Sequence, residues 1–352
     1  MSRFFNQKLK KLKVYTPGEQ PQDKKYIKLN TNESPYPPSP SVIKAINETE
    51  IKKLRLYCDP ECSILRNSVA ELHKVKENNI FLSNGSDDII NFAFWAFGQN
   101  GVIFPDITYG FYSVFAELHG LNAETVPLNE DFSIDVEKFK NTDKLVVIAN
   151  PNAPTGISLP LQTIEEIIVS NKNNVVLIDE AYVDFGGESC ADLTRKYDNL
   201  LCVGTFSKSR SMAGARLGFA IANSDLISDL ERIKFSTNPY NVNRLTQIAG
   251  NAAIEENDYY MDNCKKIIKT REFVVKELEN SGFTVLPSKA NFVFAKSEKI
   301  SGEKLYLKLK EKGILVRHFT KERIFDFNRI TIGSFEEMKV FIEKVKEILG
   351  EL

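Results

Sequence analysis

Residues 200–216 read LLCVGTFSKSRSMAGAR and place a lysine close behind a run of apolar residues. The apolar run at 200–206 predicts a buried β-strand. Ligands of α/β proteins collect at the carboxyl ends of strands, so Lys208 is well placed for chemistry. A second apolar strand, 175–178, leads into Asp179, which precedes the lysine by 29 residues. Both side chains therefore lie at the carboxyl ends of predicted strands, where a ligand-binding site is expected.

Lys208 and Asp179 are the residue types that pyridoxal phosphate (PLP) requires of a protein. The lysine amine can form a Schiff base with the cofactor, and the aspartate can hold its pyridinium nitrogen. Arg216, eight residues after the lysine, could clamp the cofactor phosphate. Alone, each residue would be interpreted as a solvated lysine or an ordinary acid at a strand end. The assignment therefore depends on the rest of the chain.

Two further motifs accompany this pair. NPNAPTG at 150–156 follows another apolar strand, and DEAY occupies 179–182. In this order, with SK at 207–208 and then Arg216, they resemble the fold-type I PLP aminotransferases of class I and II. The resemblance covers residues from about 27 to 348. It implies an α/β protein with a large domain, built on a seven-stranded mostly parallel sheet covered by helices, and a smaller α+β domain.

The hydrophobic pattern favours the same architecture, because short apolar runs alternate with helical patterns from residue 80 onward. We expect strands at 80–82, 102–104, 123–126, 145–149, 175–178, 201–206 and 218–222. We expect an N-terminal arm at 1–28, a large PLP-binding domain at 51–280, and a discontinuous small domain formed by 29–50 and 281–352.

Three other segments narrow the resemblance to one branch of the family. They are LNTNESPY at 29–36, Tyr57 within RLYCDP, and VRHF at 316–319 followed by RITIG at 329–333. These segments are similar to the histidinol-phosphate aminotransferases of histidine biosynthesis. The resemblance implies a ping-pong transamination that interconverts histidinol phosphate and 2-oxoglutarate with imidazole-acetol phosphate and glutamate.

The resemblance also assigns roles to individual residues. Lys208 would carry the cofactor and act as the base, Asp179 would keep the ring nitrogen protonated, and Tyr182 would hydrogen-bond the phenolic oxygen of the ring. Tyr109 would stack on the ring. The remaining cofactor contacts would come from Gly85, Ser86, Asp87, Asn152, Thr205, Ser207 and Arg216, and from Tyr57 of a neighbouring chain.

The segment Gly85-Ser86-Asp87 has a physical reason to bind phosphate. A glycine at a strand-to-helix turn lets the backbone approach a ligand closely, and a helix start presents free N–H groups. Acids in a first helical turn are also stabilising by themselves, so this signal is weak in isolation.

One position departs from the family pattern. The family usually has an asparagine before Pro-Thr-Gly, where it donates to the phenolic oxygen of PLP, and this chain has Ala153. An alanine cannot donate, so the contact is absent or is supplied by Asn152 or Tyr182. Its uncompensated loss would cost about 1 kcal/mol.

Substrate recognition requires groups that bind anions. By the resemblance, Arg329 would grip the substrate's carboxylate or its phosphate, and Arg317 would be a second grip, since a guanidinium suits bidentate contacts with either group. Tyr15, Asn32 and Glu33 would line the rest of the pocket.

Composition excludes several other classes of protein. Lys plus Arg number 46 against 47 for Asp plus Glu, so no charge excess indicates a nucleic-acid or membrane partner. The five cysteines are too scattered for a disulfide framework, and neither they nor the three histidines have convincing ligand spacing, so we expect no metal. The cytoplasm is the expected location, because no long apolar stretch or signal-like segment occurs.

The expected assembly is a homodimer with shared active sites, in which the arm lies across the partner. Three alternatives remain open at this point. An aromatic amino acid aminotransferase or a threonine-phosphate decarboxylase would share all the cofactor residues. The effector domain of a PLP-fold transcription regulator is disfavoured by the short arm and the balanced charge.

Overall fold

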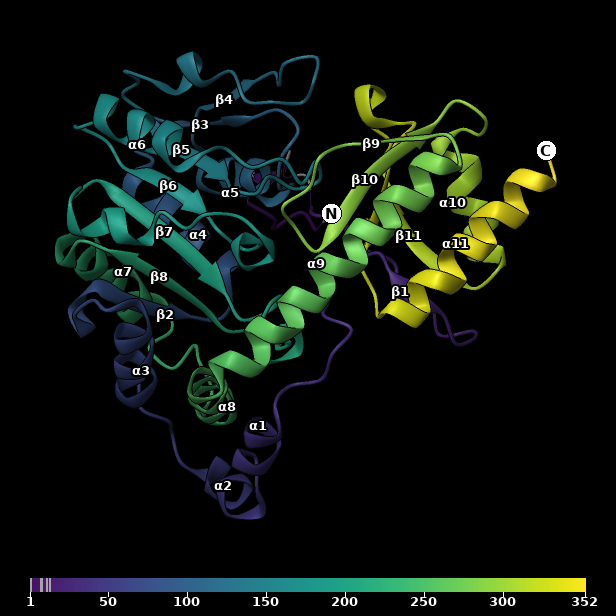
Figure 1. Cartoon of the computed structure of the whole chain (residues 1–352). Helices are drawn as coiled ribbons and strands as arrows, with labels where there is room; N and C mark the ends of the chain where they lie inside the picture. Colours follow the sequence, from purple (N-terminus) through teal and green to yellow (C-terminus); the bar gives the residue numbers. More distant parts are fainter. Residues whose placement is uncertain (1, 7–8, 11, 13) are drawn as a thin grey trace.

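The computed structural model describes residues 2–6, 9–10, 12 and 14–352, and it contains two sheets (Figure 1). The larger sheet has seven strands in the order β2-β8-β7-β6-β5-β3-β4. Strand β8 is antiparallel to both of its neighbours, and the other adjacent pairs are parallel. The bounds are β2 Ile80–Ser83, β3 Val102–Pro105, β4 Ala123–Val126, β5 Leu145–Ala149, β6 Val176–Asp179, β7 Leu200–Thr205 and β8 Gly218–Ala222. The expected seven-stranded, mostly parallel sheet is confirmed.

Helices cover both faces of this sheet, because its central strands bury side chains on both sides. In β5, Val146 and Ile148 pack into the core on one face, and Leu145 and Val147 pack into the core on the other. The first core includes α3 Ser63–His73, α6 Leu161–Ser170 and α8 Arg244–Glu255; the second includes α4 Ser86–Phe97, α5 Phe111–His119 and α7 Ser224–Thr237.

The smaller sheet has five strands in the order β1-β11-β12-β10-β9. Its apolar side packs against helices to form a third core. The strands are β1 Ile27–Leu29, β9 Phe283–Val285, β10 Phe292–Ser297, β11 Ile314–His318 and β12 Asn328–Thr331, and the helices are α9 Asn257–Asn280, α10 Gly302–Glu311 and α11 Phe335–Gly350. Short 3-10 turns lie at 53–55, 77–79, 136–139, 183–185, 191–195, 213–215 and 322–324.

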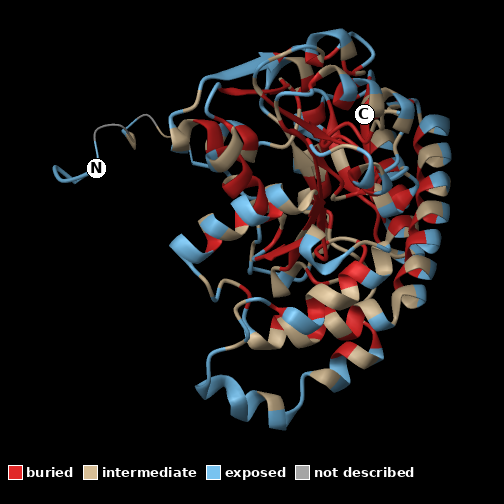
Figure 2. Ribbon diagram, turned by 90° about the vertical axis from the view of Figure 1, so that its left-hand side faces the viewer, coloured by how far each residue is buried: buried red, intermediate tan, exposed pale blue. Residues whose placement is uncertain are grey.

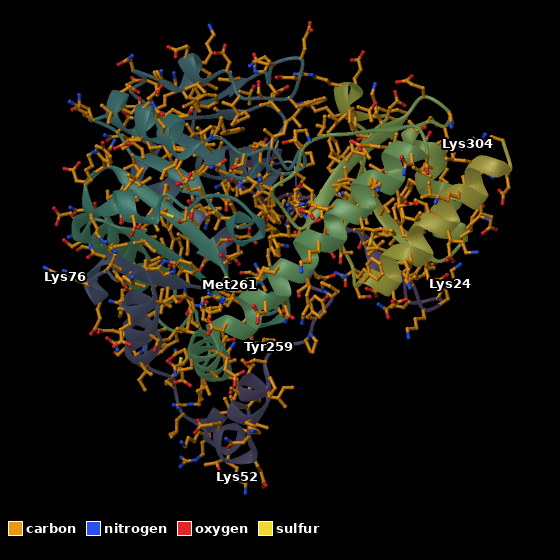
Figure 3. All side chains as sticks on the ribbon, viewed as in Figure 1. Lys24, Lys52, Lys76, Tyr259, Met261 and Lys304 are labelled. Carbon is orange, nitrogen blue, oxygen red and sulfur yellow. The ribbon has the colours of Figure 1, made fainter. Side chains whose placement is uncertain are left out.

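Helix α9 joins the two halves of the molecule, and in Figure 1 it runs from beside α8 to the smaller sheet. Met261, near its start, packs against both the first core of the larger sheet and the core of the smaller one. Figure 3 labels this residue and Tyr259, whose hydroxyl donates to the carbonyl oxygen of Pro37 at 3.1 Å. One long helix thereby connects the two sheets.

Three details differ from the sequence expectations. Helix α9 lies within the segment expected to be the large domain, yet four of its buried side chains pack into the core of the smaller sheet. Strand β1 begins at Ile27, inside the segment expected to be an arm, and pairs in parallel with β11. Helices α1 Pro40–Ala45 and α2 Glu48–Lys52 fall in the part expected to belong to the small domain, yet α1 packs against α8 of the large one. The reason is local: Val42 is buried in the first core, and the Ser39 backbone donates to the Tyr260 hydroxyl at 2.9 Å.

The arm is divided between two environments. The N-terminal end projects away from the body of the protein (Figure 2), and positions 1, 7, 8, 11 and 13 lie outside the described residues. Residues 14–20 lie instead along their own chain, where Arg317 donates to the carbonyl oxygens of Thr16 and Pro17 at 3.1 and 3.2 Å. Within the described chain, no helix is long and apolar enough to cross a membrane.

Candidate active site

The carboxyl ends of β6 and β7 bring Asp179 and Lys208 into one cavity of about 160 Å³. This cavity collects most of the residues expected around the cofactor. Its lining includes Glu33, Ser86, Asp87, Tyr109, Asp179, Tyr182, Thr205, Ser207, Lys208 and Arg216. The topology explains the gathering, because parallel strands end at the same edge of the sheet.

Lys208 is held at the junction of the two sheets. Its Nζ atom donates to the carbonyl oxygen of Thr31 at 3.2 Å. Burial lowers its pKa to about 8, and the nearby positive charge of Arg329 acts in the same direction, whereas the negative charge of Glu33 opposes it. A lysine with this pKa has a substantial neutral fraction at physiological pH, as a nucleophile or base requires.

Asp179 is buried at the base of the cavity, with 5% of its surface exposed. Burial raises its pKa to about 6, although hydrogen bonds from the Tyr112 hydroxyl and the Ala181 backbone lower it. Its carboxylate is therefore mainly ionised at neutral pH. Tyr112 was not anticipated from the sequence, where it is one aromatic residue among several at 109–115.

A group of polar contacts surrounds the start of α4. Gly85 has a φ of +85°, which favours glycine, and an added Cβ there would lie 2.6 Å from Nη2 of Arg216. Arg216 Nη2 lies 2.9 Å from Oδ2 of Asp87, and its Nη1 donates to Ser207 Oγ at 3.4 Å. The Tyr109 hydroxyl donates to Oδ1 of Asp87 at 2.7 Å.

The backbone is also packed tightly beneath this group. A Cβ on Gly218 would lie 2.4 Å from the backbone nitrogen of Ser86. Strand β8 can therefore approach the turn this closely only if residue 218 is glycine. The result is a cradle of helix-start amides, one hydroxyl and one guanidinium, which is the donor set that a phosphate binds.

A second cavity of about 480 Å³ adjoins the first and shares Thr31, Tyr109, Ala153, Tyr182 and Lys208 with it. The expected substrate residues Tyr15, Asn32, Arg317 and Arg329 line this second cavity, whereas Glu33 lines the first. Tyr15 belongs to the arm, and its ring stacks on that of Phe111 with centroids 4.2 Å apart.

Two expected cofactor residues lie elsewhere. The Asn152 amide is engaged by the segment that precedes α5: Nδ2 donates to the carbonyl oxygen of Ile107 at 3.0 Å, and Oδ1 accepts from the Thr108 hydroxyl at 2.8 Å. Of the two residues that could supply the contact missing at Ala153, Asn152 is thus engaged elsewhere in this structure. Tyr57 is 80% exposed and stacks on Tyr240, with ring centroids 4.6 Å apart.

Tyr182 remains able to make the contact that Ala153 cannot. Its hydroxyl accepts a hydrogen bond from Nδ2 of Asn32 at 3.0 Å. Burial raises the pKa of Tyr182, so the hydroxyl keeps its proton. That proton is free to be donated to an oxygen in the cavity.

The comparisons with known proteins agree with this geometry. Residues 24–345 match the family described as aminotransferase class I and II. The chain belongs to this family. Its cofactor is pyridoxal 5'-phosphate, and the lysine, the buried aspartate and the phosphate cradle fit that group.

Similar proteins carry more specific names. A histidinol-phosphate aminotransferase from Brachyspira hyodysenteriae is 54% identical over 352 residues, covering 99% of each chain. The crystal structure of the histidinol-phosphate aminotransferase from Clostridium acetobutylicum superposes on this aminotransferase with a TM-score of 0.85 at 28% identity, covering 93% of this chain and 100% of that one. The crystal structure of histidinol-phosphate aminotransferase from Sinorhizobium meliloti in complex with pyridoxal-5'-phosphate superposes with a TM-score of 0.89 at 22% identity. It covers 100% of this chain and 99% of that one, and this likeness shows the fold.

One further cluster of potential metal ligands lies outside the cofactor cavity. Glu180, Cys190 and Cys202 are buried, with ligand atoms within 4.8 Å of one another. The Glu180 carboxylate already accepts hydrogen bonds of 2.6 Å from Ser189 Oγ and from the backbone of Cys190. Neutral donors thus satisfy the Glu180 carboxylate, and we assign the cluster of Glu180, Cys190 and Cys202 a structural role.

Proposed function

We propose that this aminotransferase interconverts histidinol phosphate and 2-oxoglutarate with imidazole-acetol phosphate and glutamate. The observation that carries this proposal is a pair of arginines without counter-ions. Arg317 and Arg329 lie directly opposite each other on β11 and β12 and line the same cavity as Lys208. Like charges in such a pair destabilise a sheet, so their retention calls for a negatively charged ligand.

Neither arginine forms an ion pair within 4.0 Å among the residues that the structure describes. Arg329 donates from Nη2 to the carbonyl oxygen of Asn30 at 3.0 Å, and its Nε is buried without a partner in that same part of the chain. A buried donor of this kind is costly until a ligand occupies it. A phosphate monoester or a carboxylate supplies the missing acceptors and the charge.

The names of the relatives support the phosphate ester as the amino donor. Histidinol phosphate has no carboxylate, so the two arginines would bind its phosphate, and in the second half-reaction they would bind the carboxylates of glutamate. One site for both anions fits a ping-pong reaction, because the two substrates occupy it in turn.

The roles of the protein groups follow from their positions. Asp179 would hold a positive charge at the ring nitrogen, and the helix start at Ser86 with Arg216 would hold the phosphate. When bound, the cofactor delocalises the negative charge that develops at the α-carbon of the substrate. Lys208 Nζ, neutral above about pH 8 and placed between both cavities, takes the proton from that carbon.

We also propose a homodimer with shared active sites. Exposed apolar side chains gather between residues 43 and 64, where Ile43, Ile51, Leu54 and Ile64 are all largely exposed. Tyr57 lies in the middle of this stretch, is exposed, and lines neither the cofactor cavity nor the adjoining cavity of its own chain. A second copy of the chain would cover these side chains. Tyr57 of the first chain would then lie near the cofactor phosphate bound by the second copy.

We further propose a cytoplasmic location, which the five free thiols favour, since thiols stay reduced in that compartment. The substrate assignment is tested by assaying purified enzyme with histidinol phosphate and 2-oxoglutarate and measuring glutamate. Parallel reactions contain aromatic amino acids, or threonine phosphate with detection of carbon dioxide. Greater kcat/KM for an aromatic amino acid, or carbon dioxide release from threonine phosphate, would contradict it.

A further inference from the structure

Tyr112 makes a hydrogen bond that ties helix α5 to the end of strand β6. Its hydroxyl donates to Oδ2 of Asp179 at 2.8 Å, and the Ala181 backbone N–H donates to Oδ1 at 3.1 Å. Each carboxylate oxygen of Asp179 therefore has one donor and retains a lone pair. Tyr112 does not line the cofactor cavity, and its hydroxyl acts on the site through Asp179.

The position of this hydroxyl is fixed by the packing of the ring. Tyr112 is 0% exposed, and aromatic rings from β3, from α4 and from the loop before α5 surround it. Phe104 of β3 and Tyr109 meet it edge to face, with centroid distances of 5.8 and 5.6 Å, and Phe94 of α4 lies at 6.3 Å. A phenol held in an apolar cluster needs a partner for its hydroxyl, and Asp179 is that partner.

Tyr109 precedes Gly110, the N-cap of α5, and Tyr112 lies in the first turn of that helix, so their rings meet edge to face at 5.6 Å. Tyr109 faces the cavity and holds Asp87 beside the phosphate cradle, while Tyr112 holds Asp179. The segment from Tyr109 to the first turn of α5 thus contacts two of the acids around the cofactor site.

We propose that Tyr112 is a positioning residue that keeps Asp179 ionised and oriented toward the cofactor's ring nitrogen. The proposal rests on the aminotransferase assignment and adds to it a residue that touches neither substrate nor cofactor. A hydrogen bond to a carboxylate stabilises the charged form, and here it opposes the burial that favours protonation. Without it, Asp179 would be protonated at a higher pH and would attract the ring nitrogen less.

The test uses Tyr112→Phe, which removes the hydroxyl and keeps the ring. The dissociation constant of PLP from apoenzyme is measured by absorbance titration from about pH 5.5 to about pH 8, a range that brackets the pKa of a buried aspartate. In the wild type, affinity falls as the pH falls through the pKa of Asp179, since protonation removes the anion. In the variant this loss begins about one pH unit higher, giving about 5-fold weaker binding at the wild-type midpoint and approaching 10-fold at lower pH.

Tyr260→Phe is the matched control. Tyr260 is also 0% exposed, and its hydroxyl also makes a buried hydrogen bond, to the Ser39 backbone. Both substitutions lower the thermal unfolding midpoint, but only Tyr112→Phe shifts the pH profile of PLP binding. In an Asp179→Asn background, Tyr112→Phe should change neither the profile nor the affinity.

Two results would overturn the proposal: a Tyr112→Phe profile that superposes on the wild type, or an equal shift in the Asp179→Asn background. Failure of wild-type apoenzyme to bind PLP at all would instead contradict the aminotransferase assignment. The two failures are thereby distinguished. Kinetics gives a second readout, because loss of ring-nitrogen charge lowers kcat while the arginines, which set KM, are untouched.

Discussion

The Nζ atom of Lys208 lies 3.2 Å from the carbonyl oxygen of Thr31, although the two residues are 177 positions apart in the chain. Lys208 follows β7 of the larger sheet, and Thr31 follows β1 of the smaller one. The contact spans the junction between the two sheets, where the two cavities meet. A movement of one sheet against the other would therefore change the environment of the lysine directly.

The pH dependence of cofactor uptake should report the charges around this lysine. Only the neutral amine attacks a carbonyl, so uptake of PLP by apoenzyme should accelerate as pH rises through about 8. Arg329→Gln removes a positive charge that lowers the lysine's pKa, so its profile should move to higher pH. Glu33→Gln removes a negative charge that raises the pKa, so its profile should move to lower pH. Stopped-flow absorbance measures both, and shifts in the same direction would contradict the assignment.

Asp179→Ala should reduce turnover by orders of magnitude, because an unprotonated ring nitrogen is a poor acceptor of the substrate's electrons. The phosphate contacts at Ser86 and Arg216 remain, so the variant should still bind cofactor. Steady-state kinetics at saturating PLP checks the first point, and gel filtration followed by phosphate analysis checks the second. Turnover close to that of the wild type would mean that another group protonates the ring.

Arg329→Ala should raise KM for histidinol phosphate and for glutamate alike, since one guanidinium serves both anions. Loss of one partner from a buried charged pair costs about 2–5 kcal/mol, which is at least about 30-fold in binding. Arg323→Ala is the control, because that arginine donates to the carbonyl oxygens of Leu128 and Asn129 outside the two cavities. If glutamate alone is affected, the phosphate is bound elsewhere, with Arg317 and Tyr15 as candidates.

The shared-site dimer predicts complementation between two damaged chains. Lys208→Ala and Tyr57→Ala chains, each nearly inactive alone, are refolded together. A heterodimer combines Lys208 of one chain with Tyr57 of the other, which restores one site and leaves the second doubly damaged. With equal mixing, roughly a quarter of wild-type activity should return. An impaired Tyr57→Ala enzyme that gains nothing on mixing would place Tyr57 within its own subunit's site.

Much of the larger sheet could be predicted from the sequence, because its buried strands are apolar runs with clear ends. The strands at 123–126, 145–149 and 218–222 have the predicted bounds. Strand β1 was missed because three residues carry little pattern, and Ile27–Leu29 becomes a strand only by pairing with β11, far away in the chain. Tertiary contacts decide such short elements.

Some residues of the site could likewise be predicted from the sequence, and others could not. Lys208, Asp179 and Arg216 could be found from motif spacing, because each is fixed by the strand or turn that carries it. Tyr112 could not, since its role depends on a hydrogen bond to a residue 67 positions away. The contacts of Asn152 could not be predicted either, because its side chain bonds to the Ile107 carbonyl oxygen and the Thr108 hydroxyl, which its own motif does not contain.

The covalent attachment point of the cofactor tests the central claim most directly. Holoenzyme is treated with borohydride, which makes an imine linkage permanent, then digested, and the peptides are sequenced by mass spectrometry. We expect one modified lysine, Lys208, carrying the mass of the reduced cofactor, and loss of the visible absorption band in Lys208→Ala. Modification of a different lysine in the wild type, or a visible band and transamination retained in Lys208→Ala, would contradict it.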